Sequence, residues 1–148
     1  MNLLAQPHAF LPNFMTRHNV ATNTTIYPTE DIGIAIAGEM YDNLVRGDLV
    51  MMAGDRTSPN AHTKYETVSF LGKPCKFPIG TFKFAKSLAH PIFAICVMNS
   101  GGEKYTVYVK EIKSKNTKDM INDYAKFLEK LILKYPKQWF NFFDFFEQ

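Results

Sequence analysis

DLVMMAGDR, residues 48–56, is the stretch from which the fold can be argued first. Its apolar core, LVMMA, shows no alternation of apolar and polar residues, which is typical of a β-strand covered on both faces. Such strands belong to folds in which helices flank a sheet. The stretch therefore predicts a strand in an α/β domain, with the polar pair Asp55 and Arg56 following at the end of the sheet.

A helix is expected before this strand. Thr29 can serve as its N-cap, and two acidic residues in the first turn suit the helix dipole. Apolar residues recur about every fourth position up to about Val45, and Gly47 then closes the helix. The recurring apolar residues are Ile32, Ile36, Met40 and Leu44.

Two more helices are expected after the strand. One follows Pro78, a residue tolerated at the first helical position, and runs to about Ala89. The other has the clearest pattern in the chain: Asn116 or Thr117 caps it, a continuous apolar stripe follows, and Pro136 stops it. That stripe consists of Met120, Ile121, Tyr124, Phe127, Leu128, Leu131 and Ile132.

Further strands are expected between the helices. Thr67–Leu71 reads as a strand that ends at Gly72, and Pro91–Met98 is a second fully apolar run. The alternating segment 105–112 follows a turn marked by two glycines, so it should form an antiparallel hairpin with the preceding strand. A short strand at Asn2–Ala5 is also expected. The order of elements predicts a layered α/β/α domain with a mixed, mostly parallel sheet.

Length and composition bound the protein class. At 148 residues, with 46% hydrophobic residues, the whole chain 1–148 is expected to form one domain. The net charge of +3, which reads as evenly spread, suits an anionic partner such as a phosphate or an acidic membrane surface. Cys75 and Cys96 form no Cys/His cluster with the histidines, so no metal site and no cofactor is expected. No stretch is long and apolar enough to span a membrane.

The candidate binding residues are Asp55 and Arg56, which follow the buried strand at the mouth of the sheet. The guanidinium of Arg can grip a phosphate or a carboxylate with two hydrogen bonds. The alternative is structural, with Asp55 serving as a local turn cap or as half of an ion pair. The residues alone name no reaction and no catalytic group.

The C-terminal stretch KYPKQWFNFFDFFEQ, residues 134–148, is unusually aromatic for a chain end. Trp139 and Phe140 are expected to fill the core. The four phenylalanines that follow are too many for one face, so some should point outward to an acyl groove or a membrane surface. Simple packing or a dimer contact is the alternative. Those four are Phe142, Phe143, Phe145 and Phe146.

Several blocks, in this order, resemble the C-terminal half of the bacterial lipid A biosynthesis acyltransferases, within the lysophospholipid acyltransferase-like superfamily. The blocks are LVRGDLVMMAGDR, VSFLGKPCKFPIGTFKFAKSLAHPIFAICV and YAKFLEKLILKYPKQWFNFFDFF. The resemblance covers about Glu30 to the end and implies an incomplete acyltransferase-like fold. It also implies transfer of a fatty acyl chain from an acyl carrier protein or acyl-CoA thioester to a hydroxyl of an anionic lipid acceptor, in lipid A, lipopolysaccharide or related lipid biosynthesis.

The resemblance also implies roles for particular residues. Asp55 and Arg56 match the block beside the family's active site, where Arg56 would neutralise a phosphate or a developing oxyanion. Pro78, Gly80 and Pro91 match positions that shape the backbone.

The family's catalytic His-x-x-x-x-Asp/Glu motif, in which the histidine is the general base, is missing from this chain. His8 and His18 are each followed five positions later by Asn, and His62 precedes Glu66 by only four. Two explanations stay open: a fragment whose catalytic half lies upstream, or a shortened homologue that binds a lipid or partner without catalysis.

The resemblance places the protein at the cytoplasmic face of the bacterial inner membrane, as a peripheral protein in contact with the membrane surface. Nucleic acid is not expected as a partner, because no basic stripe with interleaved exposed aromatic residues precedes the tail. Apolar faces and strand edges left uncovered by a partial fold would favour homo-oligomers.

Overall fold

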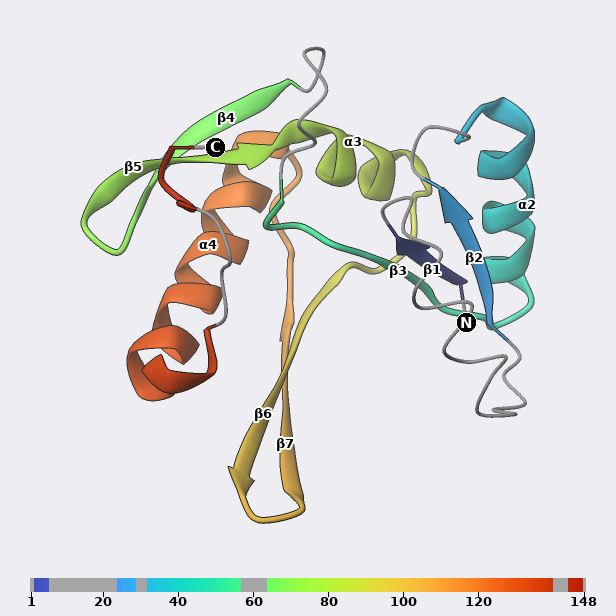
Figure 1. Ribbon diagram of the computed structural model, residues 1–148. Coiled ribbons are helices and arrows are strands. Elements are labelled where there is room, and N and C mark those ends of the chain that lie inside the picture. Colours follow the sequence, from blue (N-terminus) through green and yellow to red (C-terminus); the bar gives the residue numbers. More distant parts are fainter. Residues whose placement is uncertain (1, 6–23, 29–31, 57–63, 140–143, 148) are drawn as a thin grey trace. The chain divides into compact units, whose positions relative to one another are not determined.

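The computed structural model describes residues 2–5, 24–28, 32–56, 64–139 and 144–147 (Figure 1). The chain divides into two compact units, Met1–Ala53 and Gly54–Gln148, and each is described by itself.

The first unit contains a three-stranded parallel sheet in the order β2-β1-β3. Its strands are β1 (Asn2–Ala5), β2 (Thr25–Pro28) and β3 (Val50–Met52). The expected strand at Asn2–Ala5 and the expected strand within DLVMMAG are both confirmed. Strand β2 was not foreseen, because four residues between polar segments carry too short a pattern to be read.

Helix α2 (Ile34–Val45) belongs to the same unit. It begins later than expected, with Gly33 at the N-cap, while Thr29 lies outside the described residues. Met40 is completely buried, as its place in the apolar stripe predicts. The hydroxyl of Tyr27 in β2 donates a 2.6 Å hydrogen bond to Oε1 of Glu39, which ties the helix to the sheet.

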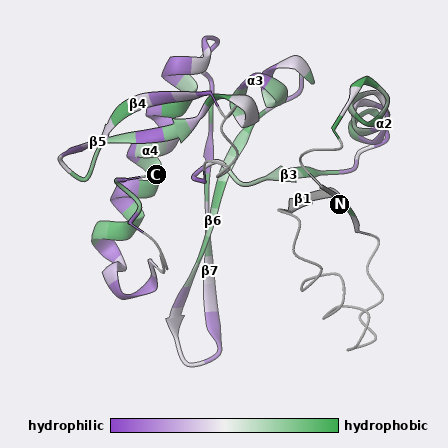
Figure 2. Cartoon of the chain, turned by 45° about the horizontal axis from the view of Figure 1, so that its top comes forward, coloured by the Kyte–Doolittle hydropathy of each residue, from purple (hydrophilic) through white to green (hydrophobic). Residues whose placement is uncertain are grey.

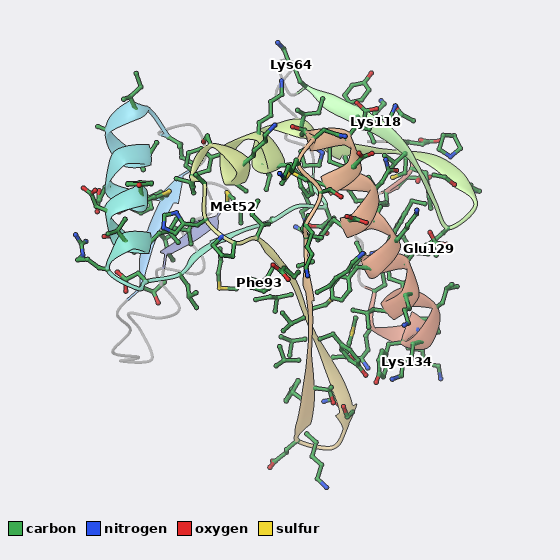
Figure 3. All side chains as sticks on the ribbon, turned by 180° about the vertical axis from the view of Figure 1, so that it is seen from behind. Met52, Lys64, Phe93, Lys118, Glu129 and Lys134 are labelled. Atoms are coloured by element: carbon green, nitrogen blue, oxygen red, sulfur yellow. The ribbon has the colours of Figure 1, made fainter. Side chains whose placement is uncertain are left out.

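The second unit opens with an antiparallel hairpin made of β4 (Tyr65–Phe70) and β5 (Lys73–Pro78). The two turn residues, Leu71 and Gly72, have φ angles of 51° and 78°. Positive φ at both central positions is the geometry that joins two strands tightly. Glu129 of α4 supports this turn, because its Oε2 accepts a 3.2 Å hydrogen bond from the Leu71 N–H (Figure 3).

Helices α3 (Ile79–Ser87) and α4 (Thr117–Lys134) lie where the sequence predicts them. Pro78 is the N-cap of α3, directly before its first residue. Asn116 caps α4, and its side-chain oxygen accepts a 2.8 Å hydrogen bond from the Asp119 N–H. This confirms the predicted cap, one of the local interactions that stabilises a helix end.

The second hairpin, β6 (Phe93–Gly101) with β7 (Lys104–Glu111), is antiparallel and confirms the prediction for this segment. Its back face carries Ala94 and Met98, both buried on the side of α4. The short helix η2 (Pro136–Gln138) closes onto β6: the Gln138 side chain exchanges two 2.8 Å hydrogen bonds with the backbone N–H and C=O of Asn99. The Gln138 side-chain amide thus pairs with the edge of β6 as the backbone of a neighbouring strand would.

An aromatic core fills the second unit between the β4–β5 hairpin, α4 and the C-terminal tail. Phe70 and Phe77 are completely buried, and Phe145 is 3% exposed. The rings of Trp139 and Phe145 lie 5.3 Å apart and both contact Phe70. The tail is therefore anchored in the core at Trp139 and again at Phe145, and Phe146 is half-buried beside them. Phe140, Phe142 and Phe143 lie outside the described residues.

The predicted layered α/β/α domain with a mixed, mostly parallel sheet is wrong for the described residues. The strands form three separate sheets, two of which are antiparallel hairpins; only the β2-β1-β3 sheet is parallel. The error began at KPCKFP, 73–78, where two prolines hid strand β5. A proline can occupy a strand only where no ladder hydrogen bond is needed from its nitrogen, and a two-stranded hairpin provides such edges. With β5 present, β4 pairs locally instead of joining a common sheet.

Within the described residues, none of the helices combines the length and the apolar composition needed to span a membrane.

Candidate functional site

The candidate site is built around Gly54, at the start of the second unit. This glycine is buried, and a Cβ added to it would lie 3.2 Å from Cζ of Tyr124 and 3.4 Å from Cζ of Phe82. The two rings pack edge to face, with centroids 5.5 Å apart. Helices α3 and α4 thus supply an aromatic wall, and the backbone at Gly54 can lie against it because a side chain is missing there.

Asp55 lies near enough to Cys96 of β6 and Tyr124 of α4 for its charge to act on both. Burial, and then the carboxylate of Asp55, raise the pKa of the Cys96 thiol. Burial, followed by the charges of Asp55 and Cys96, raises the pKa of the Tyr124 phenol far above its ordinary value of 10.0. At neutral pH the thiol and the phenol are therefore uncharged.

Arg56 follows Asp55 and its side chain is exposed. The second unit around it is basic: Gly54–Gln148 contains 15 of the 17 Lys and Arg but 9 of the 14 Asp and Glu, a formal charge of +6. The unit Met1–Ala53 carries −3. The charge is therefore unevenly divided between the two units, and the expectation of an even spread is wrong. The Arg56 guanidinium belongs to the unit that attracts anions.

In the part of the chain that the structure describes, His90 is the single histidine, and its Nδ1 lies 2.6 Å from the Leu88 carbonyl oxygen. His8, His18 and His62 lie outside the described residues. Among the side chains described, no three of His, Cys, Asp and Glu gather as metal ligands would.

The residues matched as backbone shapers occupy suitable positions. Pro78 precedes α3, Gly80 lies in its first turn with open space where a Cβ would be, and Pro91 lies two residues before β6. Pro78 and Pro91 thus mark element boundaries, where a fixed φ and a missing N–H are tolerated. Gly80 has no steric need to be glycine in this structure.

Sequence reasoning identified Asp55 and Arg56 but not Cys96, Tyr124 and Phe82, which surround this segment. Tyr124 was placed on the apolar stripe of its helix, which is correct. Its proximity to Asp55 joins residues about seventy positions apart, and no local pattern reports such a contact. The one available signal was Gly54, since a glycine beside a strand can mark a site that another segment approaches closely.

Replacing Gly54 by valine is expected to destabilise the protein by about 1–3 kcal/mol, because the new side chain must displace two packed rings. Urea unfolding monitored by circular dichroism measures the change. Gly80→Ala is the control: it adds a methyl group in open space within a helix and should stabilise the protein by about 0.5–1 kcal/mol. Equal responses of the two variants would contradict the packing described for Gly54.

Asp55→Asn should shift the alkylation of Cys96 to lower pH, because it removes a negative charge that raises the thiol pKa. The pH profile of iodoacetamide labelling, recorded in a Cys75→Ala background, gives the midpoint. Glu103→Gln, which removes a carboxylate at the exposed hairpin tip, should leave the profile unchanged. An identical profile for Asp55→Asn would show that the carboxylate does not act on the thiol.

Comparison with known proteins gives no match, either to a family model or to a curated protein.

Proposed function

We propose that this chain is the acceptor-side part of a lipid acyltransferase, which transfers a fatty acyl chain from an acyl carrier protein or acyl-CoA thioester to a hydroxyl of an anionic lipid. The proposal comes from the ordered series of sequence blocks described above. The observation that supports it best is the placement of Gly54, Asp55 and Arg56: Gly54 is wedged against Tyr124 and Phe82, and the exposed Arg56 follows two residues later.

The role assigned to each residue follows from its chemistry. The exposed guanidinium of Arg56 binds a phosphate of the lipid acceptor, and the surrounding positive charge of the unit draws the anion in. Asp55, held beside the uncharged Tyr124 and Cys96, keeps the adjacent backbone in place. Since His-x-x-x-x-Asp/Glu is missing from the 148 residues, the general base that would activate the acceptor hydroxyl has to come from elsewhere.

Lipid acceptors are presented at a membrane, so the proposal places the protein at the cytoplasmic face of the bacterial inner membrane. It binds there as a peripheral protein, and the basic second unit meets anionic head groups. Each lysine close to such a surface contributes about 1 kcal/mol to binding.

Vesicle co-sedimentation tests the role of Arg56. The full chain should sediment with vesicles that contain anionic phospholipid and remain in solution with vesicles of phosphatidylcholine alone. Arg56→Ala should lower the bound fraction several-fold. Arg46→Ala is the matched control, because Arg46 is equally exposed but caps α2 in the other unit, where its guanidinium bonds to Asn43. Equal binding by the two variants would refute the role of Arg56.

The coding DNA tests the catalytic part of the proposal. An in-frame His-x-x-x-x-Asp/Glu upstream of the Met1 codon would supply the missing base. Co-expression of that segment with this chain should then restore acyl transfer from an acyl carrier thioester. No such motif, together with no transfer, would refute the enzymatic proposal.

A second function, a binding module without catalysis, is favoured by a specific observation: hairpin β6–β7 exposes six large apolar side chains on one face. An enzyme that works through Arg56 alone does not require such a surface. Vesicle or partner binding that persists without any acyl transfer would select this second function.

A further inference from the structure

One face of the β6–β7 hairpin is apolar and exposed. Its six side chains have exposed fractions between 47% and 67%, and together they form what is called here the hairpin face. They are Phe93, Ile95, Val97, Tyr105, Val107 and Val109.

The register makes these side chains one continuous surface. Ile95 is paired with Val109 and Val97 with Val107, and directly paired residues of an antiparallel hairpin point to the same side. Phe93 and Tyr105 extend the surface toward its two ends, where their paired residues, Glu111 and Asn99, are the polar members of this face. Figure 2 colours part of β6 as hydrophobic, and Figure 3 labels Phe93 at the start of this strand.

The opposite face of the same hairpin is already covered. Nζ of Lys110 lies 3.5 Å from a carboxylate oxygen of Asp123 in α4, and Ser114 donates a 2.6 Å hydrogen bond to the same carboxylate. The hydroxyls of Tyr108 and Tyr135 lie 2.7 Å apart at the other end of α4. The hairpin therefore cannot turn its apolar face toward α4 without breaking these contacts.

A strand that is apolar on both faces is typical of a sheet buried on both sides. Strand β6 is such a strand, with Ala94, Cys96 and Met98 behind and Phe93, Ile95 and Val97 in front. Only the back is covered within this unit. The composition of β6 thus indicates that something packs on the front.

The area of the hairpin face fits a second copy of the chain. A fully covered aromatic side chain buries about 150–250 Å². The six side chains are about half exposed, so together they offer roughly 600 Å² of accessible surface per copy. Two copies would together bury about 1,200 Å², the lower end of the range for specific stable interfaces. Two twisted antiparallel hairpins of β-branched residues can also pack face to face, as the sheets of a sandwich do.

We propose that the hairpin face is a homodimer interface, in which two copies of this chain pack their β6–β7 hairpins face to face. The interface lies outside the Asp55–Arg56 segment, so dimerisation and lipid binding can fail independently.

Sedimentation equilibrium of the full chain over a concentration series tests the interface. The mass should rise from 17.0 kDa to twice that value. Val107→Asp, in the centre of the face, should weaken dimerisation by more than tenfold. Leu133→Asp is the control, because Leu133 is 69% exposed on α4, away from the hairpin face, and should leave the dimer unchanged. Thermal unfolding confirms that each variant is folded.

Three results would overturn the proposal. The first is a chain that stays monomeric at every concentration, and the second is a dimer that Val107→Asp leaves intact. The third is a monomeric chain whose binding to anionic vesicles is abolished by Val107→Asp, since lipid would then be the occupant of the face.

Discussion

Phe70→Ala is expected to lower the free energy of unfolding by about 3–5 kcal/mol, the usual range for removing a fully buried phenylalanine. The Phe70 side chain is 0% exposed. Its ring lies 5.4 Å from that of Phe77 and 5.6 Å from that of Phe145, measured between centroids. Its removal opens a cavity where the β4–β5 hairpin, α4 and the tail meet, and neighbouring helices can refill such a cavity only in part.

Urea unfolding followed by circular dichroism measures this loss. Small domains have about 5–15 kcal/mol of stability in total, so the variant should be close to unfolding at 37 °C. The matched control is Tyr65→Ala on the same strand. Tyr65 is 49% exposed and its ring carries the ammonium of Lys76 at 4.7 Å, an exposed contact that contributes about 0.5–1 kcal/mol. A similar loss in both variants would contradict the core described here.

Phe145→Ala is expected to destabilise the protein by about 3 kcal/mol or more and also to expose Cys75. Sγ of Cys75 lies 3.7 Å from the backbone carbonyl oxygen of Phe145, and both residues are buried. With the ring removed, the last residues lose their main anchor and the thiol loses its cover.

The rate of disulfide exchange between Cys75 and a chromogenic disulfide reagent, in a Cys96→Ala background, reports on this cover. The rate should rise at least tenfold in Phe145→Ala, because labelling of a buried thiol requires local opening of the structure. Glu147→Ala, an exposed change in the same tail segment, serves as the control and should leave the rate unchanged. An unchanged rate in Phe145→Ala would show that the tail does not protect Cys75.

These two variants bear on the aromatic tail. The sequence left four uses open for it: packing, a dimer contact, an acyl groove and a membrane surface. Trp139, Phe145 and Phe146 pack in the core, so for these three the structural use holds. Phe140, Phe142 and Phe143 lie outside the described residues, and the membrane or acyl-groove use stays a prediction for Phe142 and Phe143.

Local signals in the sequence were reliable where one short segment contains the whole interaction. Asn116 caps α4 through the Asp119 N–H, three residues away, and Gly101 with Gly102 turns the chain between β6 and β7 with positive φ. Each of these depends on hydrogen bonds or backbone angles within a few residues. The same holds for Pro78 at the start of α3.

Local signals failed where the sequence does not show which strands pair with each other. The β4–β5 turn places Leu71 at φ 51°, a conformation that side chains other than glycine seldom adopt. From the sequence, Gly72 and Pro74 predicted the end of a strand, instead of a turn that folds the chain back into β5. The turn persists because Glu129, fifty-eight positions away, accepts the Leu71 N–H.

By itself the sequence determined the positions of helices α3 and α4, the end of α2 and both strands of the second hairpin, because periodicity, caps and turn residues are local properties. The role of Asp55 and Arg56 stays a prediction. Tertiary structure alone decided that the strands form three sheets instead of one, that Cys96 and Tyr124 surround Asp55, and that one hairpin face stays uncovered. Strand pairing and burial depend on contacts between distant segments, whose free energies compete only once the chain has folded.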